Sequence, residues 1–108
     1  MTDIKKYRRG DQVAVLVSPG HGDGWSTWVG SKDARRMLFC PEIVEVLLES
    51  GDKSQALKIA NELFPGEHFG GMRDLEVQWV TEGSRFEITE YDGFESVVVL
   101  DDSWGYVA

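Results

Sequence analysis

The 108-residue sequence predicts a single α+β domain, in which a mostly antiparallel sheet packs against a two-helix hairpin. Two neighbouring segments, 41–50 and 54–64, repeat apolar residues at helical spacing. Later segments alternate apolar and polar residues at strand spacing, and "DG" at 92–93 predicts a type I′ turn between two of them. These three patterns favour a strand meander, closed by a hairpin, beneath a layer of two helices.

Both helices have recognisable ends. The first is expected to begin at Pro41, because the missing N–H of proline costs nothing in the first helical turn. Gly51 suits the left-handed conformation that commonly follows a helix. Asp52 and Gln55 have capping-box spacing, so the second helix is expected to start at once. The apolar faces are Ile43, Val44, Leu47 and Leu48 in the first helix, and Ala56, Leu57, Ala60, Leu63 and Phe64 in the second.

The strands follow from composition and alternation. The apolar, β-branched run at 12–18 predicts a buried strand, although its place in the sheet is left open. Segments 74–81, 84–91 and 94–101 are the expected meander strands, and 25–29 and 103–108 are candidates for short ones. Segment 31–37 is polar and indeterminate. The two-residue turn sets the hairpin register: Tyr91 opposite Phe94, Glu90 opposite Glu95, Thr89 opposite Ser96 and Ile88 opposite Val97.

The net charge of −8 is unevenly distributed along the sequence. Residues 1–54 hold 8 cationic and 8 acidic side chains, whereas residues 55–108 hold 3 and 11 and so carry all of it. This balance argues against duplex nucleic acid as a partner and permits a basic protein. No apolar run approaches the roughly 20 residues that span a bilayer. The lone cysteine, Cys40, favours a reducing, cytoplasmic setting.

The main candidate for a binding site is "SPGHGDGWSTWVG", residues 18–30, called here the glycine-rich segment. Alternating glycines allow positive φ and expose backbone N–H groups, which bind anions such as phosphate. Tryptophans stack on bases, and nearby arginines neutralise charge. The alternative is a connection whose tryptophans fill the core. The candidate ligand-binding residues are Gly20, His21, Gly22, Gly24, Trp25, Ser26, Thr27, Trp28, Arg35 and Arg36.

A second candidate is the acidic hairpin formed by Glu87, Glu90, Asp92 and Glu95. Glu90 and Glu95 are expected to face each other, and like charges directly opposite are destabilising. A sequence that keeps such a pair is consistent with a surface for a basic partner, or with an acid–base pair. The alternative is a solvated outer face.

Metal binding and nucleophilic catalysis have little support. His21, Asp23 and His68 are possible metal ligands, but nothing in the sequence brings them together, so no metal or other cofactor is predicted. Cys40 is expected at a helix N-cap, where the helix dipole lowers a thiol pKa, yet a space-filling role is the more common one. No catalytic set is identified, which favours a protein that is not an enzyme.

The stretches "GHGDGWSTW", "LFCPEIVE", "FGGMRDLEVQWVTEGSRFEITEYDGFES" and "SWGYVA" resemble a family of small, uncharacterised proteins of tailed bacteriophages. The resemblance runs from about Val15 onward and brings no established activity. The family commonly has an aromatic residue and an alanine in place of His21 and Asp23, and an aspartate in place of Cys40. These departures weaken the metal and thiol interpretations, and they imply an N-cap role for position 40.

The predicted function is that of a non-enzymatic phage accessory protein that sequesters a small anionic or nucleotide-like host signal, with counter-defence as its purpose. One alternative is an inhibitor whose acidic hairpin binds a basic host protein, and another is a minor virion or assembly component. Membrane binding is not expected. The oligomeric state is left open, with a homo-oligomer among the candidates.

Overall fold

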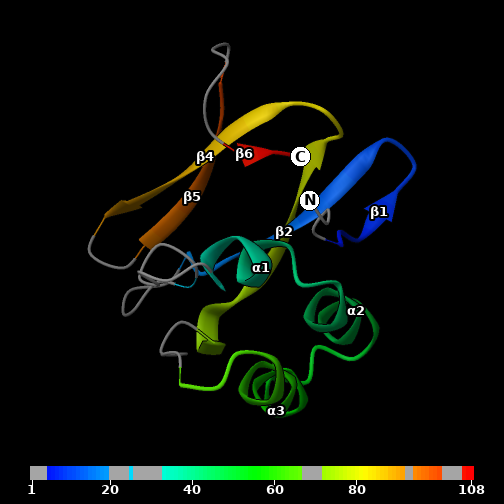
Figure 1. Ribbon diagram of the computed structural model, residues 1–108, viewed down its shortest axis with the longest axis vertical. Helices are drawn as coiled ribbons and strands as arrows, with labels where there is room; N and C mark the ends of the chain where they lie inside the picture. The colour runs from blue at the N-terminus through cyan, green and yellow to red at the C-terminus, as the bar shows by residue number, and fades with distance from the viewer. Residues whose placement is uncertain (1–4, 20–24, 26–32, 67–71, 92–93, 101–105) are drawn as a thin grey trace.

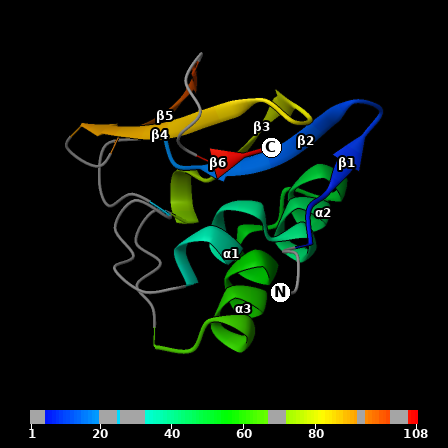
Figure 2. The same ribbon diagram turned by 45° about the horizontal axis from the view of Figure 1, so that its top comes forward.

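The computed structural model describes residues 5–19, 25, 33–66, 72–91, 94–100 and 106–108. These residues form an α+β fold in layers, as the sequence predicts (Figures 1 and 2). Helices pack on one face of a three-stranded antiparallel sheet, and a second three-stranded antiparallel sheet lies on its other face.

The first sheet consists of β1 (Arg8–Arg9), β2 (Gln12–Val17) and β3 (Glu76–Thr81), in the order β1-β2-β3. Strand β2 is therefore central and antiparallel to both neighbours, which answers the question of where the first strand joins. Strand β1 was not predicted, because two arginines give no strand pattern. It pairs with β2 through a turn at Gly10, whose φ of 61° suits glycine.

Strand β2 is buried on both faces, and residues 13–17 are all fully buried. Ala14 and Leu16 belong to the core on the helix side, whereas Val13 and Val15 belong to the core that faces the second sheet. Because successive side chains point to opposite faces, a strand with two covered faces is a continuous apolar run. This arrangement accounts for the sequence of β2.

The second sheet consists of β4 (Arg85–Tyr91), β5 (Phe94–Leu100) and β6 (Tyr106–Val107), in the order β5-β4-β6. The β4–β5 register is the predicted one, residue for residue. The three expected meander strands do not form one continuous sheet, because β3 pairs with β2 and not with β4. The turn between β3 and β4 connects the two sheets. Its Glu82 N–H donates to the Asp11 carbonyl, next to the first sheet, and its Gly83 N–H donates to the Ala108 carbonyl, next to the second.

The helices are α1 (Asp33–Phe39), α2 (Pro41–Glu49) and α3 (Lys53–Leu63), followed by a short 3-10 helix, Met72–Asp74. Helices α2 and α3 form the predicted hairpin. Gly51 has a φ of 68°, and the Asp52 side chain accepts hydrogen bonds from the N–H groups of Ser54 (3.0 Å) and Gln55 (3.2 Å). Helix α1 lies in the segment that the sequence left indeterminate. It supplies buried residues to both cores: Met37 on the helix side, and Leu38 and Phe39 on the other.

Among the described residues, no helix is long and apolar enough to cross a membrane.

The N-cap of α3 can be tested by substitution. We expect Asp52→Ala to lower the free energy of unfolding by about 1 kcal/mol, because it removes the acceptor for two N–H groups at the helix start. Asp52→Asn keeps an acceptor and is expected to retain most of the stability. Urea denaturation measures both, and equal losses for the two variants would contradict the assignment.

Candidate functional site

The most unusual residue of the structure is Glu95, near the start of β5, whose side chain is 0 % exposed. One carboxylate oxygen, Oε1, accepts a hydrogen bond from the Ser18 N–H (2.9 Å), and the other, Oε2, accepts one from the Trp25 N–H (2.8 Å). The Glu95 N–H in turn donates to the Ser18 carbonyl (2.9 Å). A buried carboxylate requires such partners, since burying an unpaired charge is very costly.

These bonds correct the predicted role of Glu95. It is not part of an exposed acidic surface, although the register opposite Glu90 is as expected. The physical reason is that the start of β5 packs against the end of β2, where backbone N–H groups receive the carboxylate. Of the other hairpin acids, Glu87 is half-buried and Glu90 is exposed, and alternation puts them on opposite faces of β4. Asp92 lies outside the described residues.

Trp25 is also buried, with 0 % exposure, and belongs to the core on the helix side. Its backbone N–H binds Glu95, and its indole Nε1–H donates to the Met37 carbonyl of α1 (2.9 Å). The prediction that Trp25 stacks on a ligand is therefore wrong, and the alternative of a core-filling tryptophan holds at this position. Buried tryptophans usually find a partner for the indole N–H, as this one does.

Ser18 and Trp25 lie on either side of three glycines of the glycine-rich segment, Gly20, Gly22 and Gly24, and both are bonded to one carboxylate. The Glu95 carboxylate thus binds the backbone on both sides of residues 19–24. The amides of Ser18 and Trp25 bind an anion, as a glycine-rich turn is expected to do, but the anion is the protein's own side chain. The remaining candidates of this segment lie outside the described residues: Gly20, His21, Gly22, Gly24, Ser26, Thr27 and Trp28.

Arg35 and Arg36 are both exposed on α1, just before the carbonyl of Met37 that receives the Trp25 indole. The Arg36 guanidinium lies 5.1 Å from the centre of the Phe64 ring, which is a cation–π distance. Two exposed guanidinium groups therefore stand on the helix to which Trp25 is bonded. Guanidinium groups form paired hydrogen bonds to phosphate and carboxylate oxygens.

Cys40 occupies the N-cap position of α2, but its side chain makes no capping hydrogen bond. It is buried, and its thiol donates to Oε2 of Glu42 (3.2 Å). Burial, with a smaller contribution from Glu42, raises the pKa of the Cys40 thiol to about 12. The thiol therefore stays protonated at neutral pH and is not a nucleophile. Within the described residues, no group of three His, Cys, Asp or Glu side chains is arranged to hold a metal ion.

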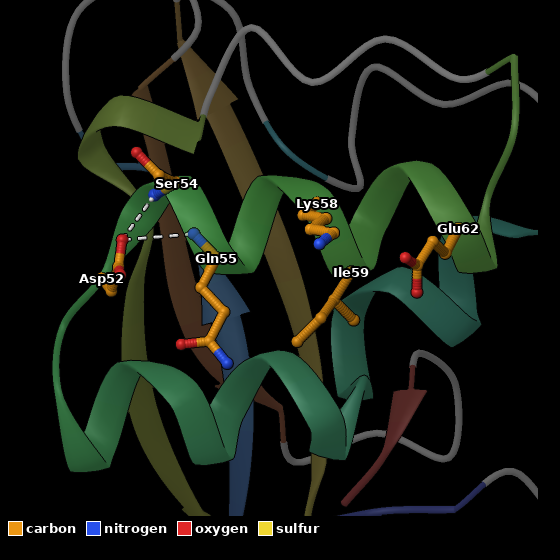
Figure 3. A pocket seen from close by; sticks show the side chains of 6 residues that line it. All are labelled: Asp52, Ser54, Gln55, Lys58, Ile59 and Glu62. Carbon is orange, nitrogen blue, oxygen red and sulfur yellow. Dashed lines mark hydrogen bonds between the residues drawn. The ribbon is translucent and has the colours of Figure 1, made fainter.

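A hollow on the surface of α3 is formed by residues other than those predicted (Figure 3). Lys58 is the one cation among its lining residues, which also include the carboxylates of Asp52 and Glu62. Asp52 is occupied in capping the helix. This charge balance does not favour an anion there. The lining residues are Asp52, Ser54, Gln55, Lys58, Ile59 and Glu62.

Sequence reasoning did not identify the anchor formed by Glu95, Ser18, Trp25 and Met37. One signal was present, because the register placed two glutamates opposite each other, and a like-charge pair suggests that one member is used elsewhere. Nothing local to Ser18 or Met37 marks them, since they take part through backbone groups.

The anchor predicts a large cost for its removal. We expect Glu95→Ala to lower the free energy of unfolding by about 2–5 kcal/mol, because it leaves two buried N–H groups without an acceptor. Glu76→Ala, which removes an exposed carboxylate on β3, is the control and is expected to change stability by less than about 0.5 kcal/mol. Urea denaturation compares them, and similar stabilities for the two variants would rule the anchor out.

Cys40 predicts a loss of stability at alkaline pH. Above about pH 8.5 the unfolded thiol releases its proton, whereas the folded thiol keeps it up to the raised pKa of about 12. The unfolded state then binds fewer protons, so we expect stability to fall by up to about 1.4 kcal/mol per pH unit in that window. Cys40→Ala lacks the titrating thiol and therefore this loss of stability. The other titrating groups are the same in both proteins, so their contributions cancel in the comparison. Urea midpoints measured from pH 7 to pH 11 test it, and parallel curves would contradict it.

No protein-family model, no curated protein sequence and no solved structure matches this chain. The resemblance to bacteriophage proteins therefore stays a prediction, and the function is inferred from the chain itself.

Proposed function

We propose that this protein is a non-enzymatic binding protein that sequesters a small anionic or nucleotide-like molecule at the glycine-rich segment. The observation that supports this most is the Glu95 anchor, a fully buried carboxylate bonded to Ser18 and Trp25 at both ends of the glycine run. Buried charges add little net stability but can define a conformation. A position at which two backbone N–H groups of the segment are held by supporting hydrogen bonds on rigid elements is the kind of support that binding sites require.

The residues then have distinct roles. Trp25 positions the segment and does not touch the ligand, so Trp28 is the stacking residue of the proposal. Arg35, exposed on α1, supplies positive charge, and Arg36 does so from its place over Phe64. The backbone N–H groups of Gly20, Gly22 and Gly24 hold the anion, and Ser26, Thr27 and His21 add polar contacts.

The net charge of −8 opposes an anionic ligand only at long range. Exposed charges are screened beyond about 8 Å at physiological salt. A guanidinium in contact with a phosphate, in contrast, forms charge-assisted hydrogen bonds that are about twice as strong as neutral ones. At the proposed site, contact with the arginines of α1 therefore makes the binding of an anion favourable despite the net negative charge.

The acidic-hairpin alternative has weaker support. Glu95 is buried, and Glu87 and Glu90 lie on opposite faces of β4, so these acids do not form one surface. The resemblance to phage proteins gives the ligand proposal its setting, which is the capture of a host signal molecule in the host cytoplasm.

The proposal is tested by incubating the purified protein with a bacterial small-molecule extract and with a panel of mono-, di- and cyclic nucleotides. Native mass spectrometry detects a retained ligand, and calorimetry measures its affinity. We expect Arg35→Ala and Trp28→Ala each to weaken binding by roughly 10- to 100-fold, the loss of a charge-assisted hydrogen bond or of base stacking. Arg8→Ala is the matched control, since Arg8 is an exposed arginine on β1 paired with Glu82.

Trp25→Ala is not informative, because removing a fully buried indole costs about 3–5 kcal/mol of stability and disturbs the fold. If no ligand is retained across extract and panel, the proposed function is wrong. If a ligand is retained equally by the wild type and by both site variants, the location of the site is wrong.

A further inference from the structure

Strand β5 forms an edge of the second sheet, and in the described residues no strand pairs with its outer side. Of the large apolar side chains described, Val99 (62 %) and Val98 (40 %) are the most exposed, and both belong to this strand. Residues 96–99 are Ser-Val-Val-Val, without charge or proline. Natural edge strands are usually protected from pairing by charges, prolines or bulges. Residues 96–99 of β5 carry neither a charge nor a proline, and the β4–β5 register has no bulge along them.

The backbone shows which residues are available on this edge. The Glu95 N–H donates to the Ser18 carbonyl, so Glu95 directs its backbone groups away from β4. Hydrogen-bonding direction alternates along an antiparallel strand, so Val97 and Val99 also direct their N–H and C=O groups outward. Ser96 and Val98 direct theirs toward Thr89 and Glu87 of β4. The N–H and C=O groups of Val97 and Val99 therefore face the outer edge, where no other described residue bonds to them.

We propose that β5 pairs with β5 of a second copy of this chain, antiparallel and about a two-fold axis at Val98. This register places Val97 opposite Val99 of the second copy, and each such pair exchanges both of its N–H···O bonds. Val98 faces Val98, so every cross-strand pair along 97–99 is apolar. The same patch meets itself, as a two-fold interface requires, and the two sheets join into one continuous sheet.

Charge favours a second copy over a charged partner at this edge. Residues 96–99 carry no charge. The acids next to them in the sequence are Glu95, which is buried and bonded internally, and Asp101, which follows the strand and lies outside the described residues. Glu87 lies opposite Val98 on β4, so the two Glu87 side chains of a dimer are separated by three strand spacings, about 14 Å. That distance exceeds the screening length of about 8 Å at physiological salt.

The test is sedimentation velocity of the whole chain over a range from about 10 μM to about 1 mM, since short strand contacts give weak association. We expect a monomer–dimer equilibrium that tightens as salt is raised, because each copy carries −8. Val98→Lys places two cations opposite each other in the dimer, while within one copy Lys faces Glu87 across the strands, so the fold is kept. It is expected to weaken the dimer at least tenfold.

Leu57→Lys is the matched control, with a similarly exposed apolar residue (37 %) on α3, which lies on the opposite side of the molecule from β5 (Figure 2). Val99→Pro is a second variant. It removes an outward N–H that β4 does not use, and edge strands tolerate proline at such positions. It is expected to abolish the dimer while the protein still unfolds cooperatively.

Hydrogen exchange gives a residue-level readout. The amides of Val97 and Val99 are expected to become protected as concentration rises, whereas those of Ser96 and Val98 are protected throughout by β4. A monomer at every concentration, or a dimer that Val98→Lys and Val99→Pro leave intact, would overturn the proposal. An added strand from a different protein, with no self-association, would also overturn it. Val98→Lys is expected to keep ligand binding, so this test fails or succeeds separately from that of the proposed function.

Discussion

The carboxylate of Glu95 is the interaction on which the rest of this structure depends. It connects two parts of the chain that are distant in sequence: the glycine-rich segment, through Ser18 and Trp25, which lie 77 and 70 residues away, and the hairpin to which Glu95 itself belongs. Through the indole of Trp25 the same connection continues to the Met37 carbonyl of α1. Burying a carboxylate costs several kcal/mol, and hydrogen bonds to a charged group contribute about 1.5–3 kcal/mol each. This cost and this gain nearly cancel, so the anchor adds little net stability and mainly determines how the connected segments are placed.

Strand β2 determines where the Glu95 anchor lies in the fold. Because this strand is covered on both faces, it is the layer that helices and second sheet share, and its last residues meet elements from both sides. Ser18 follows β2 directly, and its N–H and C=O both bind Glu95. The start of β5 is thereby fixed to the end of β2. Helix α1 completes the arrangement by contributing side chains to both cores, and its Met37 carbonyl accepts the hydrogen bond of the Trp25 indole.

Local signals in the sequence predict much of this fold. Helices α2 and α3 are marked by Pro41, Gly51 and Asp52, and the register of β4 and β5 follows from the two-residue turn. The partner of β3 is not predictable in this way, because alternation identifies a strand but not its neighbour. Helix α1 was missed because its first residues are polar and it buries its last three, Met37, Leu38 and Phe39. The role of Glu95 rests on contacts far apart in sequence, so a pattern of neighbouring residues indicates only that the position is unusual.

The anchor also limits what the open edge of β5 can do. The Glu95 N–H already bonds Ser18, so a strand arriving at this edge finds its first available backbone groups at Val97. If the arriving strand shifted by two residues toward the hairpin turn, it would lie opposite Glu95, whose backbone N–H is already bonded to the Ser18 carbonyl. An exposed apolar edge strand without charges can pair repeatedly with other chains, which leads to open-ended association. Because the backbone of Glu95 is already bonded to Ser18, pairing at this edge is restricted to the short stretch centred on Val98, where a two-fold axis gives a closed dimer and not a fibre.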